Sequence, residues 1–383
     1  MKVAYLCADP GIPVFGTKGA SVHIQELVRA WRGRGDAVEA FAVRAGDQVP
    51  DGLADLALHL EKVSGKQMDA AQRERAQREA AARLARRVLD GGFEVVHERY
   101  SLFSTALAQV RRERSEQGLD TVTVLEVNAP LVDEQRTHRV LVDELGAQQA
   151  LRTQLAAADV VACVSEPVAQ WVRERMPEGA HAQLLVTPNG VNTDRIQPVE
   201  AASEPVVVFA GTLKPWHGME HLVDAAALAR REWRLRVVGD GPQRESLQAR
   251  AAEAGVAVDW VGAVAPDEVP RHLAGAMVAV APYPPSQDHY FSPLKVYEYS
   301  AAALPVVASR IGEIDWVVRD GSTGTLVPAG DPAALAAAVD ALVADPARAR
   351  RMGLAGRELM ERSHAWRHVL DATLAPVAHR MGN

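Results

Sequence analysis

A small hydroxyl, a proline and a lysine stand at the start of a predicted helix, in the segment Ser292-Pro293-Leu294-Lys295. The first turn of a helix gathers unpaired N–H groups and the positive end of the helix dipole, so it can hold an anion such as a diphosphate. Glu298 follows in the same helix, where its carboxylate can reach the two hydroxyls of a ribose. Serine and proline before a helix are also ordinary capping residues, so the segment alone leaves both interpretations open.

Two loops combine glycine with polar side chains directly after a predicted strand. They contain Gly16, Thr17 and Gly19 in the first half of the chain, and Gly211, Thr212 and Lys214 in the second. Backbone N–H groups can approach a sugar or phosphate closely at glycine, because no Cβ intervenes. A loop lysine is usually only solvated, but Lys214 is one of six lysines and follows a strand and a glycine. The first loop lacks a complete Gly-x-Gly-x-x-Gly, which argues against a nicotinamide dehydrogenase.

Polar residues also gather where two strands of the first half end. They are Glu98, Arg99 and Tyr100 after one strand, and Glu126 and Asn128 after the next. The carboxyl ends of parallel strands face the ligand crevice in doubly wound domains, so these groups are candidates for binding an acceptor or a donor sugar. The alternative is a surface ion pair between Arg99 and a carboxylate.

Metal binding is not expected from this sequence. The pairs His217/His221 and His364/His368 have the i, i+4 spacing of zinc ligands on a helix, but neither has a further acid or cysteine in a recognised metal motif. No Asp-x-Asp occurs in the chain. Without a metal, the charge on a bound diphosphate would have to be met by Lys214, Lys295 and a helix N-terminus.

Composition narrows the class of protein. A net charge of −7, from 42 basic and 49 acidic residues, argues against a nucleic-acid groove. Cys7 and Cys163 lie in apolar runs and are expected to be buried free thiols, which fits a reducing cytoplasm. No apolar run approaches the roughly 18 residues of a membrane span, so we expect a cytoplasmic protein with at most peripheral membrane contact.

Short β-branched runs alternate with helical patterns throughout, which predicts an α/β fold with parallel sheets in two domains. The expected strands are 3–7, 38–43, 94–97, 121–127, 160–164 and 184–186 in the first half, and 206–210, 235–238, 258–261, 278–281, 305–308 and 325–327 in the second. A turn-rich linker at 187–205 separates them. We place the domains at 1–196 and 197–363, followed by a terminal helix at 364–383.

The pattern Phe291-Ser292-Pro293-Leu294-Lys295 before Glu298 resembles the nucleotide-sugar site of retaining glycosyltransferases of family 4. The linker Pro188-Asn189-Gly190-Val191-Asn192 and the terminal helix with Trp366 resemble further elements of that family, so the resemblance spans the chain. It implies the GT-B architecture, in which two doubly wound Rossmann-like domains face each other across a crevice. The first domain would bind the acceptor and the second the nucleotide sugar, while the terminal helix packs back on the first.

The resemblance also assigns roles to individual residues. The loop at Gly16, Thr17 and Gly19 would fold over the donor sugar and diphosphate, and Lys214 would hold the diphosphate. The turn Gly239-Asp240-Gly241 would lie beneath the nucleotide, and the loop at Val264 would pair with the base through its backbone. The family's more general Glu-x7-Glu motif has Tyr290 at its first glutamate here.

These features predict a metal-independent, retaining glycosyltransferase without a cofactor, which moves a sugar from a nucleoside-diphosphate sugar to a hydroxyl of a small molecule or glycan. Lys214 and Glu298 are the expected catalytic residues, and a UDP-sugar is the favoured donor. The product would belong to polysaccharide or specialised-metabolite biosynthesis. The alternatives are a nucleotide-sugar epimerase on the same fold and a non-catalytic nucleotide-sugar-binding subunit.

Overall fold

A computed structural model describes residues 1–63, 68–202, 204–285, 290 and 292–381. The chain divides into two compact units: the first is Met1–Pro188 with Trp366–Asn383, and the second is Asn189–Ala365. The division at Pro188 assigns the turn-rich segment 189–196 to the second unit. The units are described separately below.

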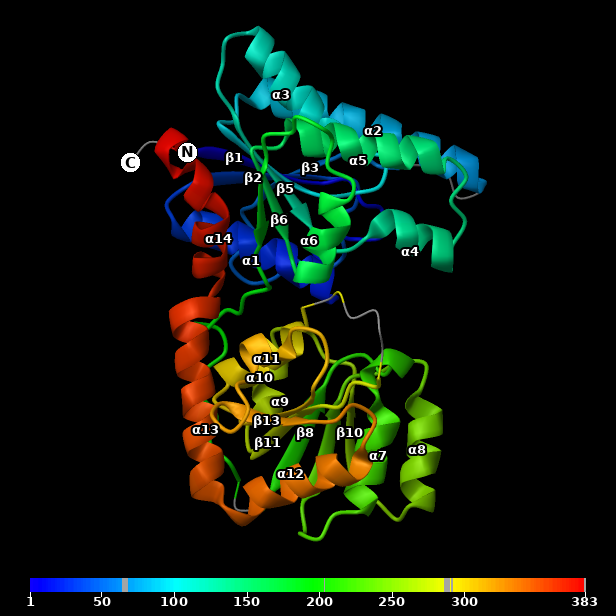
Figure 1. The fold of residues 1–383 in the computed structure, drawn as a ribbon, viewed down its shortest axis with the longest axis vertical. Coiled ribbons are helices and arrows are strands. Elements are labelled where there is room, and N and C mark those ends of the chain that lie inside the picture. The colour runs from blue at the N-terminus through cyan, green and yellow to red at the C-terminus, as the bar shows by residue number, and fades with distance from the viewer. Residues whose placement is uncertain (64–67, 203, 286–289, 291, 382–383) are drawn as a thin grey trace. The chain divides into compact units, whose positions relative to one another are not determined.

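The first unit is built on a seven-stranded parallel sheet in the order β3-β2-β1-β4-β5-β6-β7 (Figure 1). Its strands are β1 (Lys2–Cys7), β2 (Ala37–Ala42), β3 (Ala57–Leu60), β4 (Val95–Arg99), β5 (Val122–Val127), β6 (Val160–Cys163) and β7 (Gln183–Val186). Its helices are α1 (Gly19–Gly33), α2 (Ala70–Gly91), α3 (Ala106–Glu116), α4 (Leu131–His138), α5 (Glu144–Ala157), α6 (Glu166–Arg173), α14 (Trp366–Leu374) and η3 (Ala375–Arg380). Six strands fall where the sequence predicted them. The pattern missed β3, a partly exposed edge strand with no β-branched residue.

The second unit has a six-stranded parallel sheet in the order β10-β9-β8-β11-β12-β13 (Figure 1). Its strands are β8 (Val206–Ala210), β9 (Arg234–Val238), β10 (Val258–Gly262), β11 (Val278–Ala281), β12 (Val306–Ser309) and β13 (Gly324–Val327). Its helices are η1 (Pro215–His217), α7 (Met219–Ala227), α8 (Arg244–Glu253), α9 (Val269–Leu273), α10 (Leu294–Ala301), α11 (Ile314–Val317), α12 (Pro332–Ala344), α13 (Pro346–Leu359) and η2 (Met360–His364). Within the described ranges, no helix is long and apolar enough to cross a membrane.

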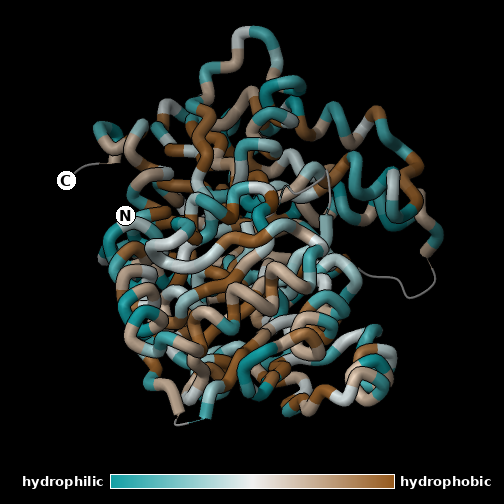
Figure 2. Tube along the Cα trace, turned by 60° about the horizontal axis from the view of Figure 1, so that its bottom comes forward, coloured by the Kyte–Doolittle hydropathy of each residue, from teal (hydrophilic) through white to brown (hydrophobic). Residues whose placement is uncertain are grey.

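Strand β8 shows why each sheet needs helices on both faces. All five of its residues are buried: Val206, Val208 and Ala210 join one hydrophobic core, while Val207 and Phe209 join another. Successive side chains of a strand point to opposite faces, so a continuous apolar run has to be covered twice. Figure 2 shows the matching alternation of brown, hydrophobic stretches with teal, hydrophilic ones along the chain.

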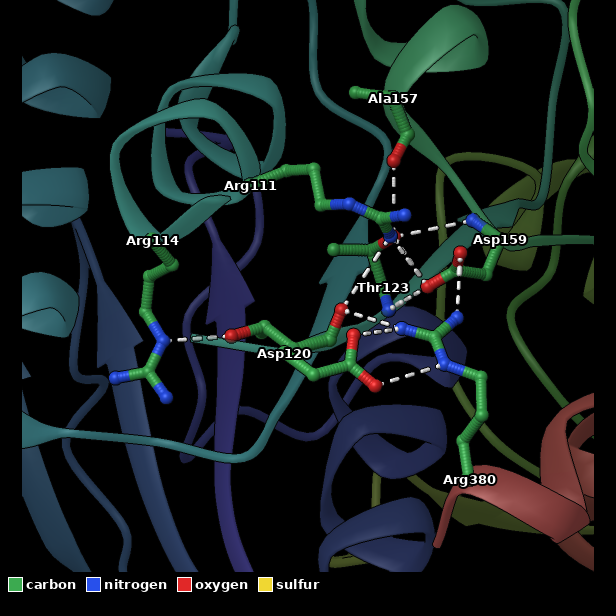
Figure 3. A network of polar contacts seen from close by, with 8 residues as sticks. Arg111, Arg114, Asp120, Thr123, Ala157, Asp159 and Arg380 are labelled. Atoms are coloured by element: carbon green, nitrogen blue, oxygen red, sulfur yellow. Dashed lines mark hydrogen bonds and ion pairs between the residues drawn. The ribbon is translucent and has the colours of Figure 1, made fainter. Parts of the chain in front are cut away.

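The C-terminal segment is tied to the first unit by a polar network (Figure 3). Arg380 donates to both carboxylate oxygens of Asp120, at 3.1 and 2.5 Å, and pairs with Asp159 at 2.7 Å. Asp159 also receives Arg111 at 2.6 Å and the backbone N–H of Thr123 at 2.8 Å. Residues more than 200 positions apart in sequence therefore hold η3 beside the start of β5.

Candidate functional site

The second unit offers a binding position where its strand order reverses. Strands β8 and β11 are neighbours in the sheet but not in sequence, and the chain leaves them in opposite lateral directions. Ligands of open parallel sheets bind at the carboxyl ends of the strands at such a point. The loop after β8 and the start of α10, which follows β11, both belong to this region. Both were singled out in the sequence.

Glycines let the loops after β8 and β9 interleave. Gly211 has φ +148° and donates to the carbonyl of Val238 at 2.9 Å, while Leu213 donates to the carbonyl of Asp240 at 2.9 Å. Gly239 has φ +139°, and a Cβ there would collide with the Gly211 carbonyl. A Cβ at Gly241 would lie 2.5 Å from the Leu213 carbonyl oxygen. Gly239 and Gly241 thus let the two turns pack backbone against backbone, and with Gly211 they form a backbone floor at this sheet edge.

Helix α10 starts without a side-chain cap. Its N-cap residue is Pro293, and no side chain caps it. Ser292 instead accepts from the Asn189 backbone N–H at 3.2 Å and donates to the Tyr297 hydroxyl at 3.0 Å. The Asn189 amide also donates to the Ser292 carbonyl at 2.7 Å. The capping interpretation of Ser292 is therefore wrong: the serine anchors the loop to the linker.

Lys295 and Tyr299 occupy the same face of α10 one turn apart. The Tyr299 hydroxyl accepts from the Ala210 N–H at 2.6 Å, which fixes the helix against the end of β8. Lys295 extends beside Gly211, where a Cβ would come within 2.8 Å of its Nζ. Lys295 lies at the start of α10, as the sequence predicted. Its close approach to the turn after β8 depends on Tyr299 and on a glycine at position 211.

Glu298 lies on the partly exposed side of α10, with one fifth of its side chain exposed. Its Oε1 is 3.6 Å from Nη2 of Arg195, a residue of the linker, and Arg195 also donates to the carbonyl of Pro266 at 2.9 Å. Arg195 was not predicted as a site residue, because nothing in the linker sequence indicates that it lies beside Glu298 of α10.

Lys214 precedes η1, and its Nζ lies 4.4 Å from the ring centroid of Trp216. Thr212 is exposed, and its carbonyl accepts the Nδ1–H of His217. Burial, followed by Lys295 and Lys214, lowers the pKa of His217 to about 4. His217 is therefore a neutral ring whose tautomer is fixed by the Thr212 carbonyl.

The remaining predicted donor residues have different surroundings. Asp240 is exposed and accepts from the Gly241 N–H at 2.7 Å, which closes the turn. Val264 packs partly buried against the core that contains β11. Leu294 begins α10. Phe291 lies outside the described residues.

In the first unit, polar side chains converge on the carboxylate of Glu126. Arg99 donates to its Oε1 at 2.7 Å, His23 Nε2 lies 3.0 Å from the same oxygen, and Tyr5 donates to Oε2 at 3.2 Å. Asn128 also donates to Oε1. Strand pairing sets this arrangement, because β4 and β5 pair Arg99 with Glu126 directly. The Arg99–carboxylate pair exists, but it is buried and not at the surface.

The electrostatics of this cluster favour an ionised Glu126. Burial opposes ionisation, but His23 and Arg99 outweigh it and hold the pKa of Glu126 well below its usual range. Trp31 donates to Nδ1 of His97 at 3.2 Å, and His97 Nε2 faces Glu126 Oε2 at 3.4 Å. The adjoining cavity has a volume of about 20 Å³, which is enough for a water molecule.

Two predicted residues lie away from this cluster. Glu98 points to the other face of the sheet, where it accepts from Ser104 Oγ at 2.5 Å and the Leu107 N–H at 2.8 Å. It is fully buried at the start of α3, and burial raises its pKa. Tyr100 packs its ring 6.4 Å from that of Trp171. Alternation along β4 sends Glu98 and Arg99 to opposite faces, so a run of adjacent polar residues could not form one site.

The glycine loop of the first unit lies along the end of β2. Phe15 donates to the carbonyl of Ala45 at 2.6 Å, and the Gln25 amide donates to the carbonyl of Gly16 at 2.9 Å. A Cβ at Gly16 would meet Ser21 Oγ at 2.5 Å. Thr17 is exposed, and exposed Gly19 begins α1 without a side-chain cap.

His97 belongs to the polar run 97–100 that the sequence singled out at a strand end, whereas His23 and Tyr5 were not predicted as members of the first-unit cluster. His23 lies on α1, and its ring meets Trp366 of α14 edge-on at 4.7 Å. Tyr5 and His97 are opposite each other in the register of β1 and β4. The available signal was a polar residue inside an apolar strand or on the apolar face of a helix. In the part of the chain that the structure describes, no group of three or more His, Cys, Asp or Glu side chains is arranged so that it could hold a metal ion.

Solved structures that resemble this chain define its fold class. Sucrose-phosphate synthase from Thermosynechococcus elongatus aligns over 100% of this chain and 99% of its own, with a TM-score of 0.72 and 20% identity. WaaG, a glycosyltransferase involved in lipopolysaccharide biosynthesis, aligns over 98% and 100%, with a TM-score of 0.68 and 14% identity. At such identities the likeness shows the fold, which is the predicted α/β GT-B architecture.

The family follows from sequence. Residues 17–195 match the model described as Glycosyltransferase Family 4, and residues 204–345 match that described as Glycosyl transferases group 1. Together the two matches cover most of the chain and support a glycosyltransferase family. The GDP-mannose-dependent alpha-(1-6)-phosphatidylinositol monomannoside mannosyltransferase of Mycolicibacterium smegmatis is 36% identical over 58% of this chain and 62% of its own length. The alpha-maltose-1-phosphate synthase of the same organism is 33% identical over 58% and 64%. The alignments thus span less than two thirds of these relatives.

Proposed function

We propose that the protein is a metal-independent, retaining glycosyltransferase that transfers a sugar from a nucleoside-diphosphate sugar to an acceptor hydroxyl. The observation that carries the proposal is the edge of the second sheet at β8 and β11. Three features lie there: the backbone floor, the ammonium groups of Lys214 and Lys295, and the start of α10, which no side chain caps. Together they would offer ammonium groups and the positive end of a helix dipole to a diphosphate.

In this mechanism the diphosphate lies at the start of α10 and the ribose hydroxyls bind Glu298. Arg195, whose Nη2 lies 3.6 Å from Oε1 of Glu298, would orient that carboxylate. Lys214 stabilises the charge that develops on the leaving diphosphate. An oxygen of the donor's own phosphate takes the acceptor proton on the face from which the leaving group departs, so no protein nucleophile is required. The protein contributes positioning and charge stabilisation.

The first unit supplies the acceptor side of the proposal. Its loop at Gly16, Thr17 and Gly19 would cover the donor sugar. Because Glu126 is buried and both of its carboxylate oxygens already have partners in the protein, we assign that carboxylate to positioning Asn128 and His23. Half-buried Asn128 is then the member of the cluster that reaches a substrate hydroxyl.

We retain a UDP-sugar as the favoured donor and a GDP-sugar as the competitor. HepE of Anabaena, which aligns with a TM-score of 0.68 and 15% identity, was solved in complex with UDP, whereas the mycobacterial mannosyltransferase is GDP-mannose-dependent. Backbone pairing near Val264 leaves no side chain that separates the two bases. The acceptor is a small molecule or glycan.

The test is calorimetry with UDP and GDP on the wild type, on Glu298→Gln and on the control Glu253→Gln, an exposed residue of α8. Charge-assisted hydrogen bonds contribute about 1.5–3 kcal/mol each, so Glu298→Gln should lose about tenfold or more in affinity for the preferred nucleotide. The control should bind like the wild type. Equal affinity in Glu298→Gln would remove Glu298 from the ribose and overturn this placement of the donor.

A further inference from the structure

The ammonium group of Lys295 is buried between two aromatic rings. Its Nζ lies 4.1 Å from the ring centroid of Phe209 and 5.5 Å from that of Tyr283, and it has no hydrogen-bond partner among the residues that the structure describes. An ammonium carries three donors, and leaving them unused away from water is costly. Two aromatic faces compensate only in part.

The fold holds Lys295 in this position instead of letting it reach solvent. Tyr299, one turn later, is bonded to Ala210 and fixes the rotation of α10. At the end of β8, Gly211 leaves open the space into which the lysine extends, because any side chain there would press on Nζ. The ammonium group of Lys295 therefore lies beside Gly211, at the backbone floor.

Among the described residues, the charged and titratable groups near Lys295 do not supply a full counter-charge. Glu298 on α10 favours the charged lysine, but its carboxylate is paired with Arg195. Lys214 is also close to His217, and His217 itself is neutral. Tyr283 stays protonated because burial raises its pKa. Burial lowers the pKa of Lys295 to about 7, with Glu298 opposing the shift.

We propose that Lys295 binds a phosphate oxygen of the donor and takes up one proton from the solvent as it does so. This inference rests on the proposed function, which places the diphosphate at the start of α10. Uptake should approach one proton per donor at pH 8 and vanish near pH 6, where the lysine is already charged. Affinity should therefore fall by up to about tenfold for each pH unit above 7, until the bound lysine itself loses its proton.

The first test uses the small number of lysines. Protein labelled with ¹³C-lysine is titrated from pH 5 to pH 10 by NMR, alone and with 10 mM UDP or GDP. One signal, absent from Lys295→Met and present in the control Lys62→Met, should titrate near pH 7 in the free protein. The preferred nucleotide, UDP or GDP, should raise that midpoint by more than one pH unit. A Lys295 signal that titrates near pH 10, or one that neither nucleotide moves, overturns the inference.

The second test measures the proton itself. Calorimetry of the preferred nucleotide at pH 8, in buffers of different ionisation enthalpy, should show uptake in the wild type and none in Lys295→Arg, whose guanidinium is always charged. Lys295→Arg should still bind. Normal binding with no uptake in the wild type refutes the role of Lys295 but leaves the donor site intact. A wild type that binds neither nucleotide refutes both proposals.

Discussion

Replacing Glu126 with alanine should strongly destabilise the first unit. The carboxylate is 6% exposed and neutralises Arg99, which is 7% exposed. Its removal leaves a buried guanidinium without its ion-pair partner, a change that costs about 3–5 kcal/mol. For a unit of this size each kcal/mol lowers the melting temperature by about 2–4 °C. The expected decrease in the first unit's transition is therefore about 6–20 °C.

Differential scanning calorimetry measures this decrease against a surface control, Glu178→Ala, which should stay within about 0.5 kcal/mol of the wild type. The pKa of Glu126 is depressed in the folded protein. Its contribution to the free energy of unfolding is thus present above the unfolded pKa of 4.5 and is lost as pH falls through the folded value. Glu126→Gln should accordingly approach the wild type in strong acid. A Glu126→Ala protein that melts at the wild-type temperature would refute the buried-charge account.

The remaining predictions concern turnover and the thiols. Added EDTA should leave turnover within about twofold, since loss of an essential metal would remove several kcal/mol of charge stabilisation; activity that EDTA abolishes and magnesium or manganese restores would contradict a metal-free mechanism. Lys214→Ala should lower the single-turnover rate at saturating donor by roughly 10²–10³ while donor binding weakens much less, and a wild-type rate would leave Lys214 as a solvated residue. Cys7 and Cys163, whose pKa values burial raises to about 12, should resist iodoacetamide at pH 8 until the protein unfolds, as mass spectrometry can check.

The fold could be predicted because hydrophobic periodicity encodes it. Runs such as Val206–Ala210 are apolar at every position, as buried parallel strands require, and helical patterns separate them. The edge strand at Ala57–Leu60 could not be found in this way, because a partly exposed strand without β-branched residues resembles a loop. The loop glycines after the strands could also be recognised in the sequence. Gly211 and Gly239 adopt backbone conformations that other residues rarely reach, so glycine is expected at such turns.

Side-chain convergence was only partly predictable. Glu126, Arg99 and Asn128 were identified, and the register of β4 and β5 brings Arg99 to Glu126. His23 reaches the same carboxylate from helix α1, more than 70 residues earlier in the chain than Arg99, which no strand pattern could indicate. Glu98 was grouped with Arg99 because they are adjacent in sequence, although neighbours on a strand face opposite ways. The burial of Lys295 depends on Tyr299 and Gly211 together, a three-residue arrangement that no single motif contains.

The central claim is that the chain turns over a nucleoside-diphosphate sugar. Incubating the protein with a panel of UDP- and GDP-sugars, and measuring the free nucleoside diphosphate released without an acceptor, tests it most directly. We predict slow release from one class of nucleotide sugar, with the sugar product keeping the anomeric configuration of the donor, and at least tenfold less release from Glu298→Gln at subsaturating donor. If the protein binds a nucleotide tightly but releases no nucleoside diphosphate from any member of the panel at high protein concentration, it is not an enzyme of this kind. The non-catalytic nucleotide-sugar-binding subunit would then be the better account.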